Sequence, residues 1–146
     1  MKTSGRPVKI TIINTNTEGE KESISTRGIY MAQGGIINVR YKETGDGGEI
    51  TETSMLIKPQ ENRASITRTG FLNNRLVFNP GKAEELYYET PFGSLVMELN
   101  TDSVRYREME DGFECRVIYT LIMGGHHSNA ERKDVRLKVQ FADAAQ

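Results

Sequence analysis

The sequence predicts an all-β protein, an antiparallel up-and-down (meander) β-barrel of about ten strands. Three observations lead to this fold class. Apolar side chains recur at every second position in several segments, which is the period of a β-strand and not of a helix. Turns rich in Gly, Asn and Pro separate these segments at short intervals. No amphipathic helix is evident that could cross over between parallel strands, so the strands are expected to be antiparallel.

The alternation is strongest in the last two predicted strands, residues 113–123 and 135–141. In the first of these, the residues at odd positions are all apolar or aromatic: Phe113, Cys115, Val117, Tyr119, Leu121 and Met123. In the second, Val135, Leu137, Val139 and Phe141 alternate with charged or polar residues. Because successive side chains on a strand point to opposite faces, one face of each strand is expected to meet a core and the other to meet water.

The same pattern recurs more weakly upstream. In chain order, the expected strands lie at residues 8–13, 24–30, 37–41, 51–57, 75–78, 86–88, 95–99 and 104–106. Turn candidates separate the strands at residues 17–19, 33–35, 45–48, 59–62, 73–74, 79–81, 91–93, 100–102, 111–112 and 124–125. Gly and Asn in these segments supply positive φ angles, and Pro presets the first turn position.

Closure into a barrel is favoured over a sandwich for two reasons. The connections are uniformly short, without the long return loop of a Greek key. An open meander would also leave two bare edges, one of them the apolar, β-branched strand at residues 8–13. Closure should therefore pair the last strand with the first. Residues 1–146 are expected to form a single domain, with residues 1–6 and 142–146 frayed.

From the composition we expect a protein of a reducing compartment without a transmembrane helix. The single cysteine, Cys115, cannot form an intramolecular disulfide and is expected to be a small buried hydrophobe. The N-terminus lacks the apolar segment of a signal peptide, and no apolar run reaches the ~18 residues of a transmembrane helix. A cytoplasmic location is the expectation.

The formal net charge of −1 argues against a general nucleic-acid binder. The charges are nevertheless distributed unevenly. Residues 54–82 contain five cations and one carboxylate, whereas residues 83–114 contain two cations and nine carboxylates. Alternating solvated strand faces explain this distribution most simply, and a basic patch for an anionic partner is the alternative.

The pattern as a whole resembles the YwiB-like family of small bacterial proteins. The order and spacing of short motifs carry the resemblance: Gly28-Ile-Tyr30, Tyr41-Lys-Glu43, Arg68-Thr-Gly70, Tyr88, Phe92-Gly93-Ser-Leu95, Thr101, Gly112, Tyr119 and Gly124. The resemblance implies a lipocalin-like (calycin-type) up-and-down barrel of unknown function, and it implies no activity. The chain has no Trp, so it lacks the Trp–Arg closure typical of secreted lipocalins.

No motif indicates catalysis, and neither a cofactor nor a metal is expected. The only histidines, His126 and His127, are adjacent at an expected hairpin tip, where neighbouring strand residues point apart and cannot chelate together. The sequence contains no nucleophile elbow, no phosphate-binding glycine loop and no dinucleotide-binding motif. No catalytic residue is therefore assigned.

The inward strand faces combine apolar residues with hydroxyl groups, which is typical of a cavity with a few placed hydrogen-bond donors. The ligand-binding candidates are Arg68, Tyr30, Tyr41, Thr53, Tyr106 and Tyr119. Arg68 shares the parity of Ala64 and Ile66, so it is expected to point inward and to need a partner. That partner is either a carboxylate of the protein, which is favoured, or an anionic ligand.

Three functions are therefore considered. The first is a binding protein that holds a small, partly apolar ligand inside the barrel, anionic if Arg68 binds it. The second is a side-chain-filled barrel that binds a protein, including a second copy of itself, through outward Ile118 and Ile122. An enzyme of unknown type ranks third. Neither nucleic acid nor a membrane is expected as a partner.

Overall fold

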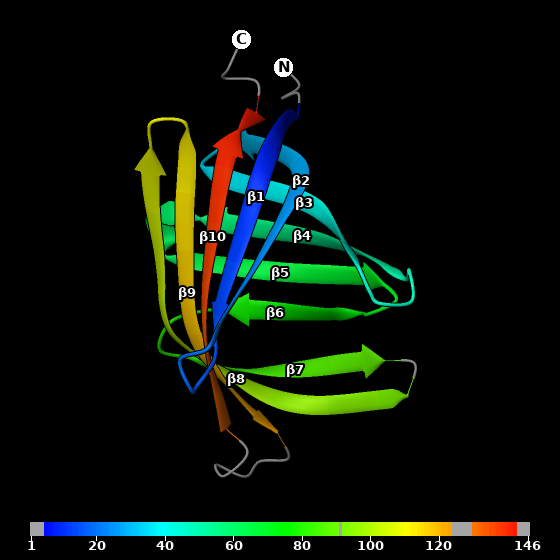
Figure 1. The fold of residues 1–146 in the computed structure, drawn as a ribbon. Coiled ribbons are helices and arrows are strands. Elements are labelled where there is room, and N and C mark those ends of the chain that lie inside the picture. The colour runs from blue at the N-terminus through cyan, green and yellow to red at the C-terminus, as the bar shows by residue number, and fades with distance from the viewer. Residues whose placement is uncertain (1–4, 91, 124–129, 143–146) are drawn as a thin grey trace.

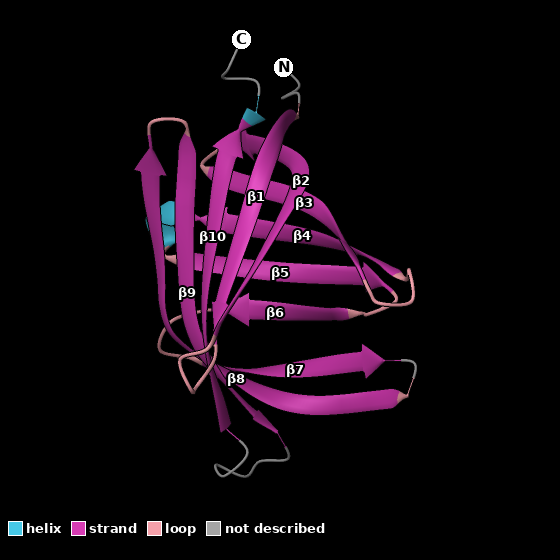
Figure 2. Cartoon of the chain, viewed as in Figure 1, coloured by secondary structure: helices cyan, strands magenta, loops and turns pink. Residues whose placement is uncertain are grey.

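The computed structural model describes residues 5–90, 92–123 and 130–142. Ten antiparallel strands form one sheet in the order β6-β5-β4-β3-β2-β1-β10-β9-β8-β7 (Figure 1). The strands are β1 (Arg6–Thr15), β2 (Lys21–Gln33), β3 (Ile36–Thr44), β4 (Ile50–Lys58), β5 (Arg63–Gly70), β6 (Asn74–Phe78), β7 (Ala83–Thr90), β8 (Gly93–Met109), β9 (Gly112–Met123) and β10 (Ala130–Phe141). A short 3-10 turn, η1 (Pro59–Glu61), joins β4 to β5. Figure 2 shows how little of the described chain is helical.

The strand order confirms the predicted meander and the predicted pairing of the last strand with the first. Nearly every strand lies beside its neighbour in sequence, and β1 pairs with β10 from Val8↔Phe141 to Thr15↔Asp134. The barrel is nevertheless not fully closed. Between β6 and β7 the described residues form one isolated bridge, Asn73↔Glu89, with N···O distances of 3.3 and 3.1 Å. The seam of the barrel therefore lies between β6 and β7, two strands that are consecutive in sequence.

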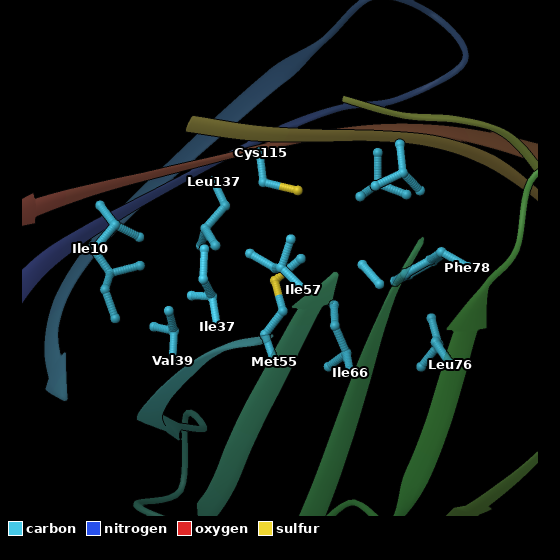
Figure 3. Close-up of a cluster of buried hydrophobic side chains, with 14 of the residues drawn as sticks. Ile10, Ile37, Val39, Met55, Ile57, Ile66, Leu76, Phe78, Cys115 and Leu137 are labelled. Carbon is cyan, nitrogen blue, oxygen red and sulfur yellow. The ribbon is translucent and has the colours of Figure 1, made fainter. Parts of the chain in front are cut away.

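Most of the predicted inward residues form the core, but Met123 at the end of β9 is 43 % exposed. Figure 3 shows side chains of β3 to β6 facing those of β1, β9 and β10 across the interior. The largest side chains with less than 2 % exposure come from seven strands of the barrel: Phe78, Phe113, Ile10, Ile57, Leu99, Val8, Val39, Val139 and Cys115. Burial of each large apolar side chain stabilises the fold by roughly 1.5–3 kcal/mol. The centre of the barrel is therefore filled with side chains.

The expectation of a turn at residues 100–102 was wrong. The segments expected as two strands, residues 95–99 and 104–106, form the single strand β8, with a bulge between Thr101 and Ser103. Leu99 and Thr101 point inward at odd positions, whereas Val104 is buried at an even position. The extra residue of a bulge shifts the alternation by one, which is why the sequence resembles two strands separated by a turn.

The sheet turns sharply at β2, and this bend opens one end of the barrel. β1 and β2 cross over β3 to β5 in Figure 1. β2 pairs with β1 from Lys21 onward but with β3 only from Gly28 onward. At Gly28 the backbones are so close that a Cβ atom would lie 2.3 Å from the Arg40 carbonyl oxygen. The first half of β2 therefore separates from β3 and leaves an opening beside the inward residues of β3 and β5.

Candidate functional site

Two adjacent spaces that share lining residues lie at this open end. An inner cavity of about 80 Å³ is lined mainly by apolar core residues of the barrel, among them Met55, Ile66 and Phe78. An outer space of about 700 Å³ lies between the β1–β2 hairpin and the ends of β5, β6, β7, β9 and β10. Four residues line both spaces: Asn14, Glu43, Arg68 and Tyr119. We call the outer space the barrel mouth.

Arg68 is held at the mouth by a protein carboxylate. Its Nε donates a hydrogen bond to Glu43 Oε1 at 3.0 Å, and the Thr53 hydroxyl donates to the same oxygen. Thr53 and Arg68 are direct partners across β4 and β5, which places both side chains on one inward row. The favoured expectation for Arg68, a partner within the protein, is thus confirmed. The sequence analysis did not select that partner, Glu43, as a site residue.

The Arg68 guanidinium keeps unused hydrogen-bonding capacity. Its side chain is only 23 % exposed, and Nε is the nitrogen that bonds to Glu43. Within the described part of the chain, neither of its terminal amino groups has a hydrogen-bond partner. A guanidinium presents five N–H donors in a planar fork, so the fork end remains available to an acceptor at the mouth.

Two buried tyrosines lie beside this ion pair. Burial is the main cause that raises the pKa of Tyr41 to about 12, with a smaller rise from Glu43 and an opposing effect of Arg68. Burial likewise raises the pKa of Tyr119, again with Arg68 opposing the change. The Tyr119 ring packs on Phe78 with 4.8 Å between centroids. Both phenols therefore stay protonated at neutral pH and can donate a hydrogen bond.

Two buried polar side chains near this end were not selected from the sequence. Asn74 is the direct partner of Arg68 across β5 and β6, and Thr101 is the partner of Tyr119 across β8 and β9. Both are buried, and the Asn74 amide atoms and the Thr101 hydroxyl have no hydrogen-bond partner in the described structure. Unpaired buried polar atoms are costly and need an explanation such as a bound molecule. Asn74 lies on the same face of its strand as Leu76 and Phe78, and this alternation could have identified it as an inward residue from the sequence.

Tyr30 and Tyr106 are not brought to the mouth. Their rings both contact Phe113, with centroid distances of 6.0 and 5.3 Å, and Tyr30 also lies edge-on to Phe141 at 5.1 Å. Neither tyrosine lines the mouth or the inner cavity. The structure thus groups four of the six predicted ligand-binding residues, while the other two belong to an aromatic cluster.

The described residues contain no group of three or more side chains suited to hold a metal ion. His126 and His127 lie outside the described residues. No helix in the described part of the chain is long and apolar enough to cross a membrane.

Cys115 lies in the core as expected, with 1 % exposure. Burial, with a smaller contribution from Glu114, raises the pKa of its thiol to about 12. Because the thiolate is the reactive form, we expect iodoacetamide to label Cys115 at pH 8 only as fast as the protein unfolds. Labelling monitored by mass spectrometry should therefore accelerate strongly in urea. Fast labelling of the native protein, at the rate of a small-molecule thiol, would contradict the burial of this side chain.

The expectation of an outward apolar patch at Ile118 and Ile122 was also wrong. Ile122 is only 7 % exposed and Ile118 is half-buried, so the two do not form an outward apolar surface. Exposed apolar side chains occur instead on the β7–β8 hairpin, where Tyr87, Leu95 and Val96 are 60 %, 50 % and 51 % exposed. Alternation alone predicts which face a side chain is on, not whether another segment covers it.

Comparison with known proteins agrees with this architecture. A family model described as a domain of unknown function, DUF1934, matches residues 8–133. The chain belongs to the DUF1934 family. The crystal structure of the ywiB protein from Bacillus subtilis has a similar fold, with a TM-score of 0.80 at 18 % sequence identity over 96 % of this chain and 95 % of that one. No curated protein matches this DUF1934 chain. The resemblance predicted from short motifs is therefore confirmed, and the similarity extends to the fold.

Proposed function

We propose that this DUF1934 protein binds a small anionic molecule at the barrel mouth. The single observation that supports the proposal most is Arg68, whose fork end has no protein partner among the described residues although the side chain is largely buried. A carboxylate or phosphate group would accept two parallel hydrogen bonds from this fork. Glu43 already accepts from Nε and thereby orients the guanidinium for such a ligand.

The other polar groups at the mouth could form hydrogen bonds with further polar atoms of the ligand. The hydroxyls of Tyr41 and Tyr119 are protonated donors, and Asn14 lines both the mouth and the inner cavity. The charges around the mouth are mixed, with Lys133 paired to Glu131 at 2.7 Å. Ligand pockets commonly combine an apolar lining with a few such placed polar groups.

The dimensions of the site favour a short ligand over a long-chain lipid. The inner cavity, about 80 Å³, has room for roughly the volume of three water molecules. Most of a bound molecule would therefore lie in the mouth, with only a short apolar extension toward Ile66 and Phe78. The sequence analysis expected a partly apolar ligand inside the barrel. Because side chains fill the centre, we propose instead a small anion at the mouth.

Isothermal titration with acetate, butanoate, octanoate and inorganic phosphate tests the proposal. We expect at least one of the short anions to bind. Octanoate should bind no more tightly than butanoate, because the inner cavity is too small for its additional methylene groups. Arg68→Met should weaken binding about 10- to 100-fold, the loss of a charge-assisted hydrogen-bond pair. Arg68→Lys keeps the charge and removes the fork, so it should lose most of the same affinity.

Arg75→Met is the matched control, because Arg75 is an exposed residue on the neighbouring strand β6 and points away from the mouth. It should bind like the unmodified protein. Unfolding curves of each variant separate lost affinity from lost stability. The proposal is wrong if none of the anions binds, or if a folded Arg68→Met variant binds as well as the Arg75→Met control.

A further inference from the structure

A second concave surface lies on the outer face of the sheet, away from the mouth. A groove of about 700 Å³ crosses β1 to β5, and its exposed lining includes Arg27, Ile29, Arg40 and Lys42. These residues alternate with inward positions such as the buried Tyr41, so their side chains are on the outside of the barrel. We call this surface the basic groove.

The basic groove combines unpaired cations with an apolar strip. Pro7 is the cross-strand partner of Ile29, which is the partner of Arg40 in turn. Ile29 is 44 % exposed. The side chains of Arg27 and Lys42 form no hydrogen bond or ion pair with another described residue, and the Arg40 side chain donates to Asn38 Oδ1 at 3.0 Å. The carboxylate that lines the groove is Glu52, so three cations face one acid.

The β7–β8 hairpin has the opposite character. On its outer face Glu85 lies opposite Glu98, the next pair on that face is Tyr87 opposite Val96, and Glu89 lies opposite Ser94. Like charges directly opposite each other on a sheet destabilise it unless a cation lies nearby. No ion pair joins Glu85, Glu89 or Glu98 to a cation of the described chain. We call this surface the acidic hairpin.

The two surfaces are complementary in both charge and apolar content. The acidic hairpin presents carboxylates on either side of an exposed Tyr87–Val96 pair, and the basic groove presents cations around an exposed Ile29–Pro7 strip. Opposite potentials steer association and fix its register, while burial of the apolar strips supplies affinity. The net charge of −1 leaves little overall repulsion between two copies.

We propose that the basic groove binds the acidic hairpin of a second copy of this chain. The contact joins two different surfaces. A reciprocal exchange of hairpins between two copies gives a two-fold, isologous dimer, whereas a one-way contact is heterologous and extends into a ring or a chain. The arrangement uses the barrel's outer face and is independent of ligand binding at the mouth.

Sedimentation velocity of the full chain over a concentration series, at low and high salt, tests this proposal. We expect concentration-dependent association that weakens as salt is raised, because exposed charges are screened. Two charge-reversal variants disrupt one surface each: Arg27→Glu with Lys42→Glu, and Glu85→Lys with Glu98→Lys. Each variant alone should associate about tenfold or more weakly than the unmodified protein.

Mixing the two variants is the decisive measurement. The reversed groove is acidic and fits the reversed, basic hairpin of the other variant, so the mixture should associate although each component alone does not. Because both chains are the same in isolation and in the mixture, misfolding cannot produce this recovery. The control is the double variant Lys58→Glu with Arg63→Glu at the β4–β5 connection, which changes the net charge by the same amount as the groove reversal. It should associate like the unmodified protein.

Three results would each overturn the proposal. They are an unmodified protein that stays monomeric over the whole concentration series, charge-reversal variants that associate as strongly as the control, and a mixture that shows no recovery. Association that survives both reversals would place the interface on another surface.

Discussion

Leu137→Asp is expected to leave the protein without a cooperative unfolding transition. Leu137 is 3 % exposed on β10 and lies opposite Ile12 on one side and Cys115 on the other, in the middle of the core (Figure 3). Loss of its side chain would cost about 2–5 kcal/mol, and an unpaired carboxylate in the same place costs several kcal/mol more. Domains of this kind are stable by only about 5–15 kcal/mol, so little or no folded protein should remain.

Lys138→Asp introduces the same side chain one residue later and serves as the control. Lys138 points to the outer face, with Glu114 and Thr11 as its cross-strand partners. The new carboxylate stays hydrated, and we expect a loss below about 1 kcal/mol, mainly from repulsion by Glu114. Urea unfolding followed by circular dichroism measures both. Equal tolerance of the two substitutions would show that the inward face of β10 is assigned wrongly.

Gly112→Ala is expected to be the most damaging single-methyl substitution among the glycines of the sheet. A Cβ atom on Gly112 would lie 1.8 Å from the carbonyl oxygen of Val139 and 2.8 Å from its carbonyl carbon. Both neighbours are backbone atoms, so the β9–β10 pairing itself must move. We expect a loss of about 3 kcal/mol or more in the free energy of unfolding, at the upper end of the range for overpacked sites.

Gly47→Ala adds the same methyl group where only the flexible Glu49 carboxylate stands close, at 2.7 Å. The carboxylate can swing away, so this control should remain within about 0.5 kcal/mol of the unmodified protein. Chemical denaturation of both variants measures the difference. A Gly112→Ala variant as stable as Gly47→Ala would contradict the close approach of β9 and β10.

The fold was predictable because its information is local. Period-two alternation in β9 and β10 and turn residues between the strands depend only on neighbouring residues, and closure followed from the apolar β1 that would otherwise be an edge. The prediction was wrong where one residue altered the alternation, as at the bulge between Thr101 and Ser103. It was also wrong for Ile122, which is buried although its parity is outward.

The candidate site was predictable in part. Parity identified Arg68 as an inward cation, and the structure places Tyr41, Thr53 and Tyr119 near it. Alternation could not separate these residues from Tyr30 and Tyr106, because the side chains of all of them point inward. Their positions along the barrel axis differ, and these positions depend on strand register. Register joins residues that are distant in sequence, and no property of one segment determines it.

The amino-acid sequence by itself determined the all-β class, the meander order, the pairing of the first strand with the last and the faces of the strongest strands. Those features arise from side-chain alternation and turn chemistry along the chain. Only the tertiary structure decided that the seam lies between β6 and β7, that Glu43 holds Arg68 at the open end, and that a basic groove and an acidic hairpin lie on the outer face. These features depend on where the sheet bends and how its strands are staggered, which many residues acting together set in three dimensions.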